Sequence, residues 1–250
     1  MSGAATDDQT QISLADEDRV KEVLVDSILK LWEVVNGLTR LRPSTQTRYR
    51  VTIFGSARAQ PGSFVYEETR RVARALTELD CDIVTGGGPG LMSAANAGAS
   101  EATAGGGRQS VGIRVSLPFE QEPNAFVTQL YEHGTFFTRL HHFVLASNAF
   151  VVAPGGIGTV LEASMIWQLL QVGHLQRTPL VFVGPMWRDF VQWGRDHMLD
   201  PSMAMASEQD LEIPLCVASG AEAIEAIRKD HSRWMREERG AAPGTGNAPR

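Results

Sequence analysis

Short apolar runs alternate with longer segments of helical periodicity along most of the chain. The runs are rich in valine, isoleucine, leucine and phenylalanine, which is typical of strands buried on both faces of a sheet. We therefore predict strands at residues 50–55, 82–85, 110–115, 126–131, 149–153, 180–183 and 214–218.

The segments between these runs predict helices, because their apolar residues recur every three or four positions. Strands that alternate with helices indicate an α/β fold with a mostly parallel sheet, covered by helices on both faces. The predicted helices span residues 64–79, 91–100, 136–147, 159–171, 187–198 and 220–237.

A further helix is predicted at residues 16–36, ahead of the α/β pattern. Asp16, Glu17 and Asp18 suit its positively charged N-terminal end. We divide the chain into residues 1–48 (a disordered start, this helix and a linker), residues 49–239 (the α/β domain) and residues 240–250 (a flexible tail). The apolar positions at helical spacing are Val20, Val23, Leu24, Ile28, Leu31, Val34, Val35 and Leu38.

The charge balance argues against a nucleic-acid partner. The 250 residues carry 29 acidic and 23 Lys or Arg side chains, a net charge of −6, which provides no net positive field for a phosphate backbone. The first twenty residues lack the basic start and apolar run of a signal peptide, so we expect a cytoplasmic protein. The weakly charged stretch at residues 139–177 is interrupted by Pro154 and nearby glycines, so we expect no membrane span.

Lysine and cysteine are scarce, and this excludes several kinds of site. The lysines are Lys21, Lys30 and Lys229, all near the ends, where a pyridoxal-phosphate Schiff base or a P-loop lysine is hard to place. Cys81 and Cys216 match no zinc spacing, and we expect buried free thiols.

Two glycine clusters each follow a predicted strand and precede a predicted helix. They are residues 86–90 and 155–159. Glycine lets backbone N–H groups approach a ligand, and a helix N-terminus attracts an anion, so the pair favours a nucleotide or sugar-phosphate site. A tight chain reversal is the alternative for either cluster alone. Neither is a dinucleotide motif, because Leu91 and Leu161 occupy the positions of its last glycine.

Glu162 and Arg139 are the charged candidates beside the second cluster. We place Glu162 in the first turn of the helix at residues 159–171, where it either complements the helix dipole or acts on a sugar or a water molecule. Arg139 lies on the preceding predicted helix, at residues 136–147, where its guanidinium either binds a phosphate or forms an ordinary ion pair. His141 and His142 are adjacent and diverge on a helix, so we expect no metal site there.

Both glycine clusters resemble motifs of one family. Residues 154–162 fit PGGxGTxxE, and residues 85–92 (TGGGPGLM) resemble GGGxxGLM with Thr85 at the position of its first glycine. In this respect the chain is similar to the LOG (Lonely Guy) family of cytokinin-activating phosphoribohydrolases, whose members are often named lysine decarboxylases. The resemblance covers roughly residues 50–184 and is looser beyond them.

The resemblance implies a Rossmann-like, doubly wound fold and at least a homodimer. It implies hydrolysis of the N-glycosidic bond of AMP or N6-modified AMP, giving free base and ribose 5-phosphate, with no metal or organic cofactor. Arg139 and Glu162 align with the family's catalytic residues. The substrate-binding residues that we assign are Ser56, Gly86, Gly87, Gly88, Gly90, Met92, Gly155, Gly156, Gly158 and Thr159.

The sequence also departs from the family pattern. Leu140 stands where a lysine is usual, Met165 where many members have a second glutamate, and Leu161 where an acidic residue is common. A non-catalytic nucleotide sensor or carrier on the same fold is therefore an alternative function. A structural or partner-binding role centred on residues 16–36 is another.

Overall fold

The chain divides into two units, residues 1–46 and 47–250, which are described separately. A computed structural model describes residues 16–38, 48–102, 107, 109–116, 122–202 and 205–241. The predicted disordered start lies wholly outside this range, as does the tail beyond residue 241.

The first unit contains one helix, α1 (Glu17–Leu38), close to the prediction for residues 16–36. Glu17 and Asp18 lie in its first turn, as the helix dipole favours. Within this unit the apolar side chains of Val23, Leu24 and Ile28 are 47–62% exposed.

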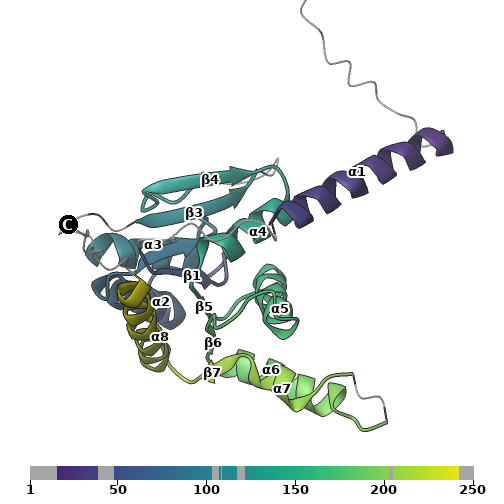
Figure 1. The fold of residues 1–250 in the computed structure, drawn as a ribbon. Helices are drawn as coiled ribbons and strands as arrows, with labels where there is room; N and C mark the ends of the chain where they lie inside the picture. Colours follow the sequence, from purple (N-terminus) through teal and green to yellow (C-terminus); the bar gives the residue numbers. More distant parts are fainter. Residues whose placement is uncertain are drawn as a thin grey trace, which may run out of the picture. The chain divides into compact units, whose positions relative to one another are not determined.

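The second unit is built on a seven-stranded parallel sheet in the order β4-β3-β2-β1-β5-β6-β7 (Figure 1). The chain runs outward from β1 to β4 and then returns to place β5 on the other side of β1, which makes a doubly wound, Rossmann-like sheet. The switch point therefore lies between the ends of β1 and β5, where Phe54 pairs with Val152. The strands are β1 (Arg50–Phe54), β2 (Asp82–Thr85), β3 (Ser110–Val115), β4 (Gln129–His133), β5 (Ala149–Val152), β6 (Leu180–Val183) and β7 (Leu215–Val217).

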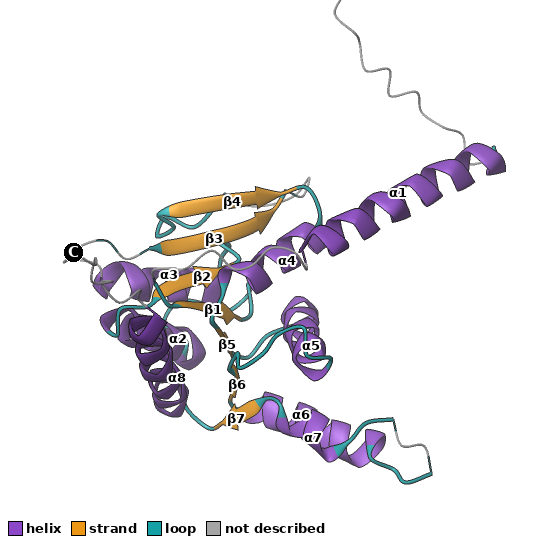
Figure 2. Cartoon of the chain, viewed as in Figure 1, coloured by secondary structure: helices purple, strands orange, loops and turns teal. Residues whose placement is uncertain are grey.

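Helices cover both faces of this sheet (Figure 2). Helices α2, α3 and α8 pack on one face around Val51 and Ile83, whereas α4, α5, α6 and α7 pack on the other around Phe54 and Phe150. Successive strand residues face opposite sides, so one apolar run supplies both cores. The helices are α2 (Phe64–Glu78), α3 (Leu91–Ala102), α4 (Phe136–Ala146), α5 (Ile157–Gln171), α6 (Pro185–Met198), α7 (Glu208–Glu212) and α8 (Gly220–Ala241).

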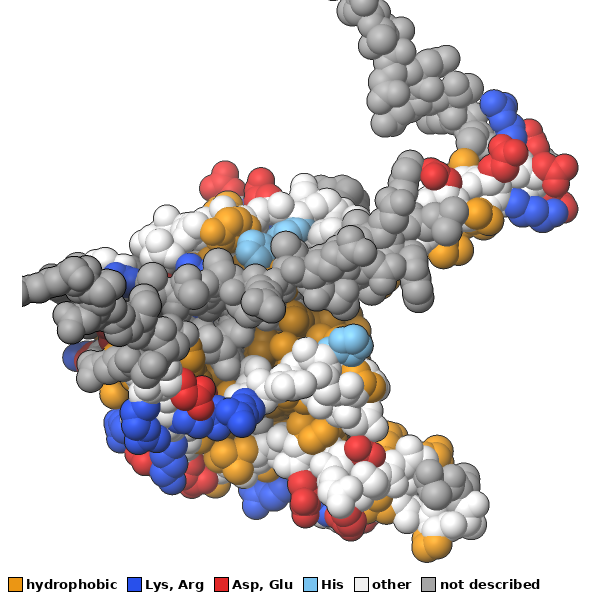
Figure 3. All heavy atoms as spheres, viewed as in Figure 1, with side chains coloured by type: hydrophobic (Ala, Val, Ile, Leu, Met, Phe, Trp, Pro, Cys, Tyr) orange, Lys and Arg blue, Asp and Glu red, His pale blue; other side chains and the backbone are white. Residues whose placement is uncertain are grey.

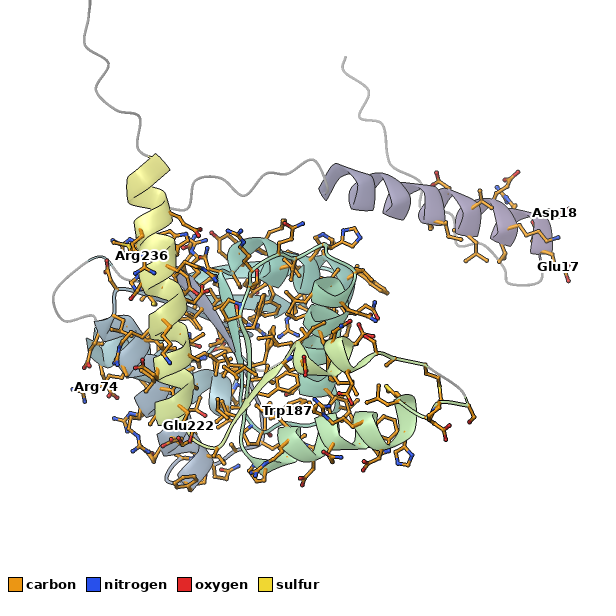
Figure 4. All side chains as sticks on the ribbon, turned by 60° about the horizontal axis from the view of Figure 1, so that its bottom comes forward. Glu17, Asp18, Arg74, Trp187, Glu222 and Arg236 are labelled. Atoms are coloured by element: carbon orange, nitrogen blue, oxygen red, sulfur yellow. The ribbon has the colours of Figure 1, made fainter. Side chains whose placement is uncertain are left out.

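The core of the second face is anchored by a tryptophan on α6. Trp187 is fully buried, and its indole N–H donates to the Ala153 carbonyl at 3.1 Å, which ties α6 to the end of β5 (Figure 4). The expected free thiols are present: Cys81 is buried, which raises its pKa to about 12, and Cys216 is half-buried. In the described part of the chain, no helix is both long enough and apolar enough to cross a membrane.

The outer surface over α2 and α8 carries intermingled acidic and basic side chains (Figure 3). Arg74 pairs with Glu78 on α2, and Arg228 pairs with Glu225 on α8. Exposed pairs of this kind contribute little to stability, and they balance each other's charge.

Strand β4 and helices α7 and α8 differ from the predictions. Strand β4 begins at Gln129 rather than at residue 126, because residues 125 and 126 form a turn. Helix α7 was missed because it is short; a capping box between Ser207 and Asp210 starts it. Helix α8 continues to Ala241, into the segment predicted as tail.

Replacing Gly98 with alanine should destabilise the second unit although alanine is the better helix former. Helices α2 and α3 approach so closely that a Cβ at Gly98 would overlap the Arg70 carbonyl oxygen. Overpacking of this kind costs about 1–3 kcal/mol, which outweighs the gain in helix propensity of up to about 1 kcal/mol. Chemical denaturation measures the change, with exposed Ser100→Ala on the same helix as the control. A Gly98→Ala protein as stable as the control would contradict this account of the helix contact.

Candidate functional site

Loops that follow three strands meet at the switch point of the sheet. The Ser56 N–H, after β1, donates to the Pro154 carbonyl after β5 at 3.1 Å. The Ser56 carbonyl accepts from the Leu91 N–H, at the start of α3, at 2.8 Å. Both glycine clusters are thereby joined through Ser56, at the edge where parallel α/β sheets bind ligands.

Arg139 and Glu162 meet at this edge. Nη1 of Arg139 lies 3.5 Å from Oε1 of Glu162, and the two side chains are only 14% and 13% exposed. They come from neighbouring helices on one face of the sheet, Arg139 from α4 and Glu162 from α5. The structure therefore brings together the two residues that the sequence analysis singled out as catalytic candidates.

Arg139 is held from several sides. Its Nε donates to the Ile113 carbonyl of β3 at 2.9 Å, and its guanidinium carbon lies 5.3 Å from the centre of the Phe143 ring. Arg139 also lies in the first turn of α4, whose N-cap is Thr135. A cation is unfavourable at that end of a helix, so its placement there is explained by its partners rather than by the helix.

Glu162 lies in the second turn of α5, not in the first as predicted. Helix α5 begins at Ile157, immediately after its N-cap Gly156, so the helix starts earlier than expected. A favourable interaction with the dipole of α5 therefore explains the position of Glu162 poorly, because this interaction falls off beyond the first turn. Burial raises the pKa of Glu162 to about 7, against the opposing attraction of Arg139. Near neutral pH this carboxyl group can both hold and release a proton.

The second glycine cluster forms the N-terminus of α5. Gly156 provides no side-chain cap, and a Cβ at Gly156 or Gly158 would meet nothing within 4 Å. Thr159 is 5% exposed. A Cβ added at Gly155 would overlap the Thr159 side chain. The result is an uncapped helix end beside open space, an arrangement suited to an anion.

The first glycine cluster packs against the same arginine. A Cβ at Gly86 would overlap Nη2 of Arg139 and would lie 2.6 Å from Sδ of Met92. A Cβ at Gly88 would lie 2.9 Å from the Met92 methyl carbon. Gly90 has φ +66° and abuts the Ser56 carbonyl, so its role is to join two loops.

The sequence analysis missed three polar residues beneath this cluster, Thr85, Asn96 and Asn124. Thr85 Oγ1 donates to Oδ1 of Asn96 at 2.7 Å, and Nδ2 of Asn124 donates to the same oxygen at 3.0 Å. Only Thr85 adjoins a motif. No sequence signal connects it with Asn124, which precedes β4.

The positions that depart from the family pattern differ in their surroundings. Leu140 is 8% exposed, and Met165 packs partly buried against the apolar core of α4, α5 and α6. Leu161, beside Glu162, is 51% exposed. Arg139 and Glu162 are thus the charged pair that these helices bring to the strand ends.

One histidine of α4 contacts a histidine of β4. His142 Nδ1 lies 2.8 Å from Nε2 of His133, at the end of β4. Among the residues that the structure describes, no group of three or more His, Cys, Asp or Glu side chains is arranged to hold a metal ion. Burial lowers the pKa of both His133 and His142, and Arg139 lowers that of His133 further.

The raised pKa of Glu162 makes the stability of the protein depend on pH. Between the ordinary value of 4.5 and about 7, the folded state holds a proton at Glu162 that the unfolded state has released. The contribution of this group to stability is therefore largest below pH 4.5, falls up to pH 7, and is constant above it.

Glu162→Gln should remove this dependence. We expect the free energy of unfolding of the variant, minus that of the wild type, to increase between pH 4.5 and pH 7 and then to level off. Urea denaturation of both proteins at several pH values measures the two free energies of unfolding. Their difference cancels the contributions of the titrating groups that the two proteins share. A difference that does not change with pH would show that the Glu162 carboxyl titrates normally.

Comparison with solved structures identifies relatives of this fold. The Moco carrier protein from Chlamydomonas reinhardtii aligns with a TM-score of 0.52 and 21% identity, over 74% of this chain and 99% of that one. The molybdenum cofactor binding protein from the phototrophic bacterium Rippkaea orientalis has a TM-score of 0.52 and 17% identity, over 74% and 98%. Identities this low show a shared fold.

Comparison of the sequence identifies the family. No curated protein matches the sequence significantly. The profile of the family described as "Possible lysine decarboxylase" matches residues 92–227, which is more than half of the chain and includes Arg139, Glu162 and the PGGxGTxxE motif. The chain therefore belongs to this family, the LOG family that its two glycine motifs resemble.

Proposed function

We propose that the protein is a nucleoside 5′-monophosphate phosphoribohydrolase. It would hydrolyse the N-glycosidic bond of AMP or of an N6-modified AMP and release free base and ribose 5-phosphate. The observation that carries this proposal is the buried pair of Arg139 and Glu162 beside the uncapped N-terminus of α5, in a chain of the LOG family.

The phosphate is assigned to the turn at residues 155–159. The free N–H groups of the first turn of α5 and the helix dipole attract an anion there, without a lysine. Gly86, Gly87 and Gly88 form the facing wall, and Arg139 orients the nucleotide through the phosphate or the ribose.

The chemistry is assigned to Glu162. Its carboxylate would hold the ribose hydroxyls, stabilise the positive charge that develops on the sugar, and take a proton from the water that attacks the anomeric carbon. The C–O bond forms as the C–N bond to the base breaks. In the net reaction, the water supplies its hydroxyl group to the anomeric carbon and its proton, passed on by Glu162, to the departing base. A carboxyl group with a pKa of about 7 suits this proton transfer at neutral pH. The scheme requires no metal or organic cofactor.

A non-catalytic nucleotide carrier or sensor is the second candidate. The solved structures with this fold include two proteins that carry or bind the molybdenum cofactor. In addition, Leu140 and Met165 replace charged residues common in the family, which leaves fewer groups for catalysis. A carrier would bind its ligand tightly and return it unchanged.

The remaining assignments are proposals about organisation. We propose a cytoplasmic homodimer or larger homo-oligomer that binds neither nucleic acid nor membranes, with residues 49–239 as the catalytic domain. The exposed apolar side chains of α1 leave a structural or partner-binding role for that helix as a third candidate. Deleting residues 1–46 should then abolish an oligomer or a partner complex and leave nucleotide binding intact.

Incubation with a panel of nucleotides tests the function. Purified protein is mixed with AMP, GMP, CMP, UMP and N6-isopentenyl-AMP, and released base is separated by chromatography. We expect base release from AMP or its N6-modified form. Tight binding without release from any of the five would favour the carrier.

A further inference from the structure

The glycine-rich loop after β2 is held by hydrogen bonds at successive peptide groups. The Gly87 N–H donates to Oγ1 of Thr85 at 2.9 Å, and the Gly87 carbonyl accepts from the Asn124 N–H at 2.9 Å. The Gly88 carbonyl accepts from Nδ2 of Asn124, also at 2.9 Å. Asn124 therefore binds two consecutive carbonyl groups of a loop that precedes it by more than thirty residues.

The side chains that hold the loop are themselves fixed. Asn96, on α3, is fully buried; its Oδ1 accepts from Thr85 and Asn124, and its Nδ2 donates to Oγ of Ser110 at 2.8 Å. This network joins β2, α3, β3 and the segment before β4. A buried network whose polar groups are satisfied is rigid, so it can fix a run of three glycines that would otherwise be flexible.

The loop in turn touches the proposed catalytic machinery. Gly86 lies so close to Arg139 that the smallest side chain at this position would overlap Nη2. On its other sides the guanidinium meets the Ile113 carbonyl, the Phe143 ring and Glu162. A shift of the loop would therefore open or close space for the guanidinium and change its distance from Glu162.

We propose that Asn124, acting with Asn96 through the Gly86–Gly88 loop, is a positioning residue that sets the place of Arg139 opposite Glu162. Asn124 itself lies outside both glycine motifs, in the segment between β3 and β4. The consequence for turnover rests on the proposed function, whereas the consequence for Arg139 does not.

The test compares Asn124→Ala with Thr128→Ala, which lies in the same segment. The Thr128 hydroxyl exchanges two hydrogen bonds with the Ser110 backbone, and neither bond reaches the loop. The readout without ligand is the pKa of Glu162, measured by ¹³C NMR of the side-chain carboxyl. Because Arg139 lowers this pKa, its displacement in Asn124→Ala should raise the pKa by roughly half a unit or more, whereas Thr128→Ala should leave it unchanged.

A double-mutant cycle separates positioning from general damage. In an Arg139→Ala background, Asn124→Ala should produce no further shift, since the residue through which it acts is gone. If Asn124→Ala fails to fold, Asn124→Ser retains an oxygen for the Phe126 N–H, which Oδ1 accepts at 3.2 Å, and removes only the amide donor. An unchanged Glu162 pKa, or an equal shift with and without Arg139, would overturn the proposal.

Kinetics with AMP then address the proposed function separately. We expect Asn124→Ala to lower kcat/KM by about tenfold, with no additional loss in Arg139→Ala, because misplacement of a positioned group slows the reaction. If wild-type protein releases no base, the proposed function fails, and the NMR cycle still decides whether Asn124 positions Arg139.

Discussion

Glu162→Gln should reduce base release by roughly 10²–10⁴-fold, the usual contribution of a general acid or base. Glutamine keeps the shape of the side chain, but it can neither accept a proton from water nor balance the positive charge on the sugar. Folding should be spared, because a neutral group at this buried position avoids the desolvation that raises the pKa of Glu162 to about 7.

The control is the same substitution at an exposed acid, Glu78→Gln on α2, which should leave turnover unchanged. Nucleotide affinity, measured by calorimetry, should change much less than turnover in Glu162→Gln. In the wild type, kcat/KM should fall as the pH decreases below about 7, because protonation removes the carboxylate that acts on the sugar. Turnover of Glu162→Gln within a few-fold of the wild type would remove Glu162 from the mechanism.

Gly86→Ala should lower kcat/KM by about 10²-fold, although the change adds only one methyl group. That methyl would overlap Nη2 of Arg139 and press on Met92, so the guanidinium must shift and its contact with Glu162 must change. Misplacement of a reacting group by about 1 Å can cost this much. Steady-state kinetics measure the loss, and circular dichroism checks that the fold is retained.

Gly134→Ala provides the matched control. Gly134 lies between β4 and α4, and a Cβ there would meet nothing within 4 Å. Its activity and stability should stay close to those of the wild type. If Gly86→Ala were as active as Gly134→Ala, the loop would not set the position of Arg139.

The fold was predictable from sequence because burial of the strands on both faces leaves a clear apolar pattern. Strands β2, β3 and β6 have the bounds that were predicted, and the family match covers the second glycine motif. Strand β4 was placed three residues early because its alternating, half-exposed residues give a weaker signal at the edge of the sheet.

The candidate site was predictable only in part. Glu162 ends the PGGxGTxxE motif and Arg139 aligns with a catalytic residue of the family, and the order of the strands brings their helices together. Asn96 and Asn124 act through tertiary hydrogen bonds across the sheet, which leave no local pattern in the sequence. The pKa of Glu162 likewise depends on burial by residues distant in sequence, so the sequence indicated the carboxylate but not its titration.

The stoichiometry of products from AMP or N6-isopentenyl-AMP tests the central claim most directly. Free base and ribose 5-phosphate are quantified over time for the wild type and for Glu162→Gln at equal concentration. The proposed hydrolysis predicts equal amounts of both products from the wild type and a rate lower by at least about 10² in the variant. Nucleotide that is bound and recovered intact, with neither product formed, would contradict the hydrolase and identify a carrier.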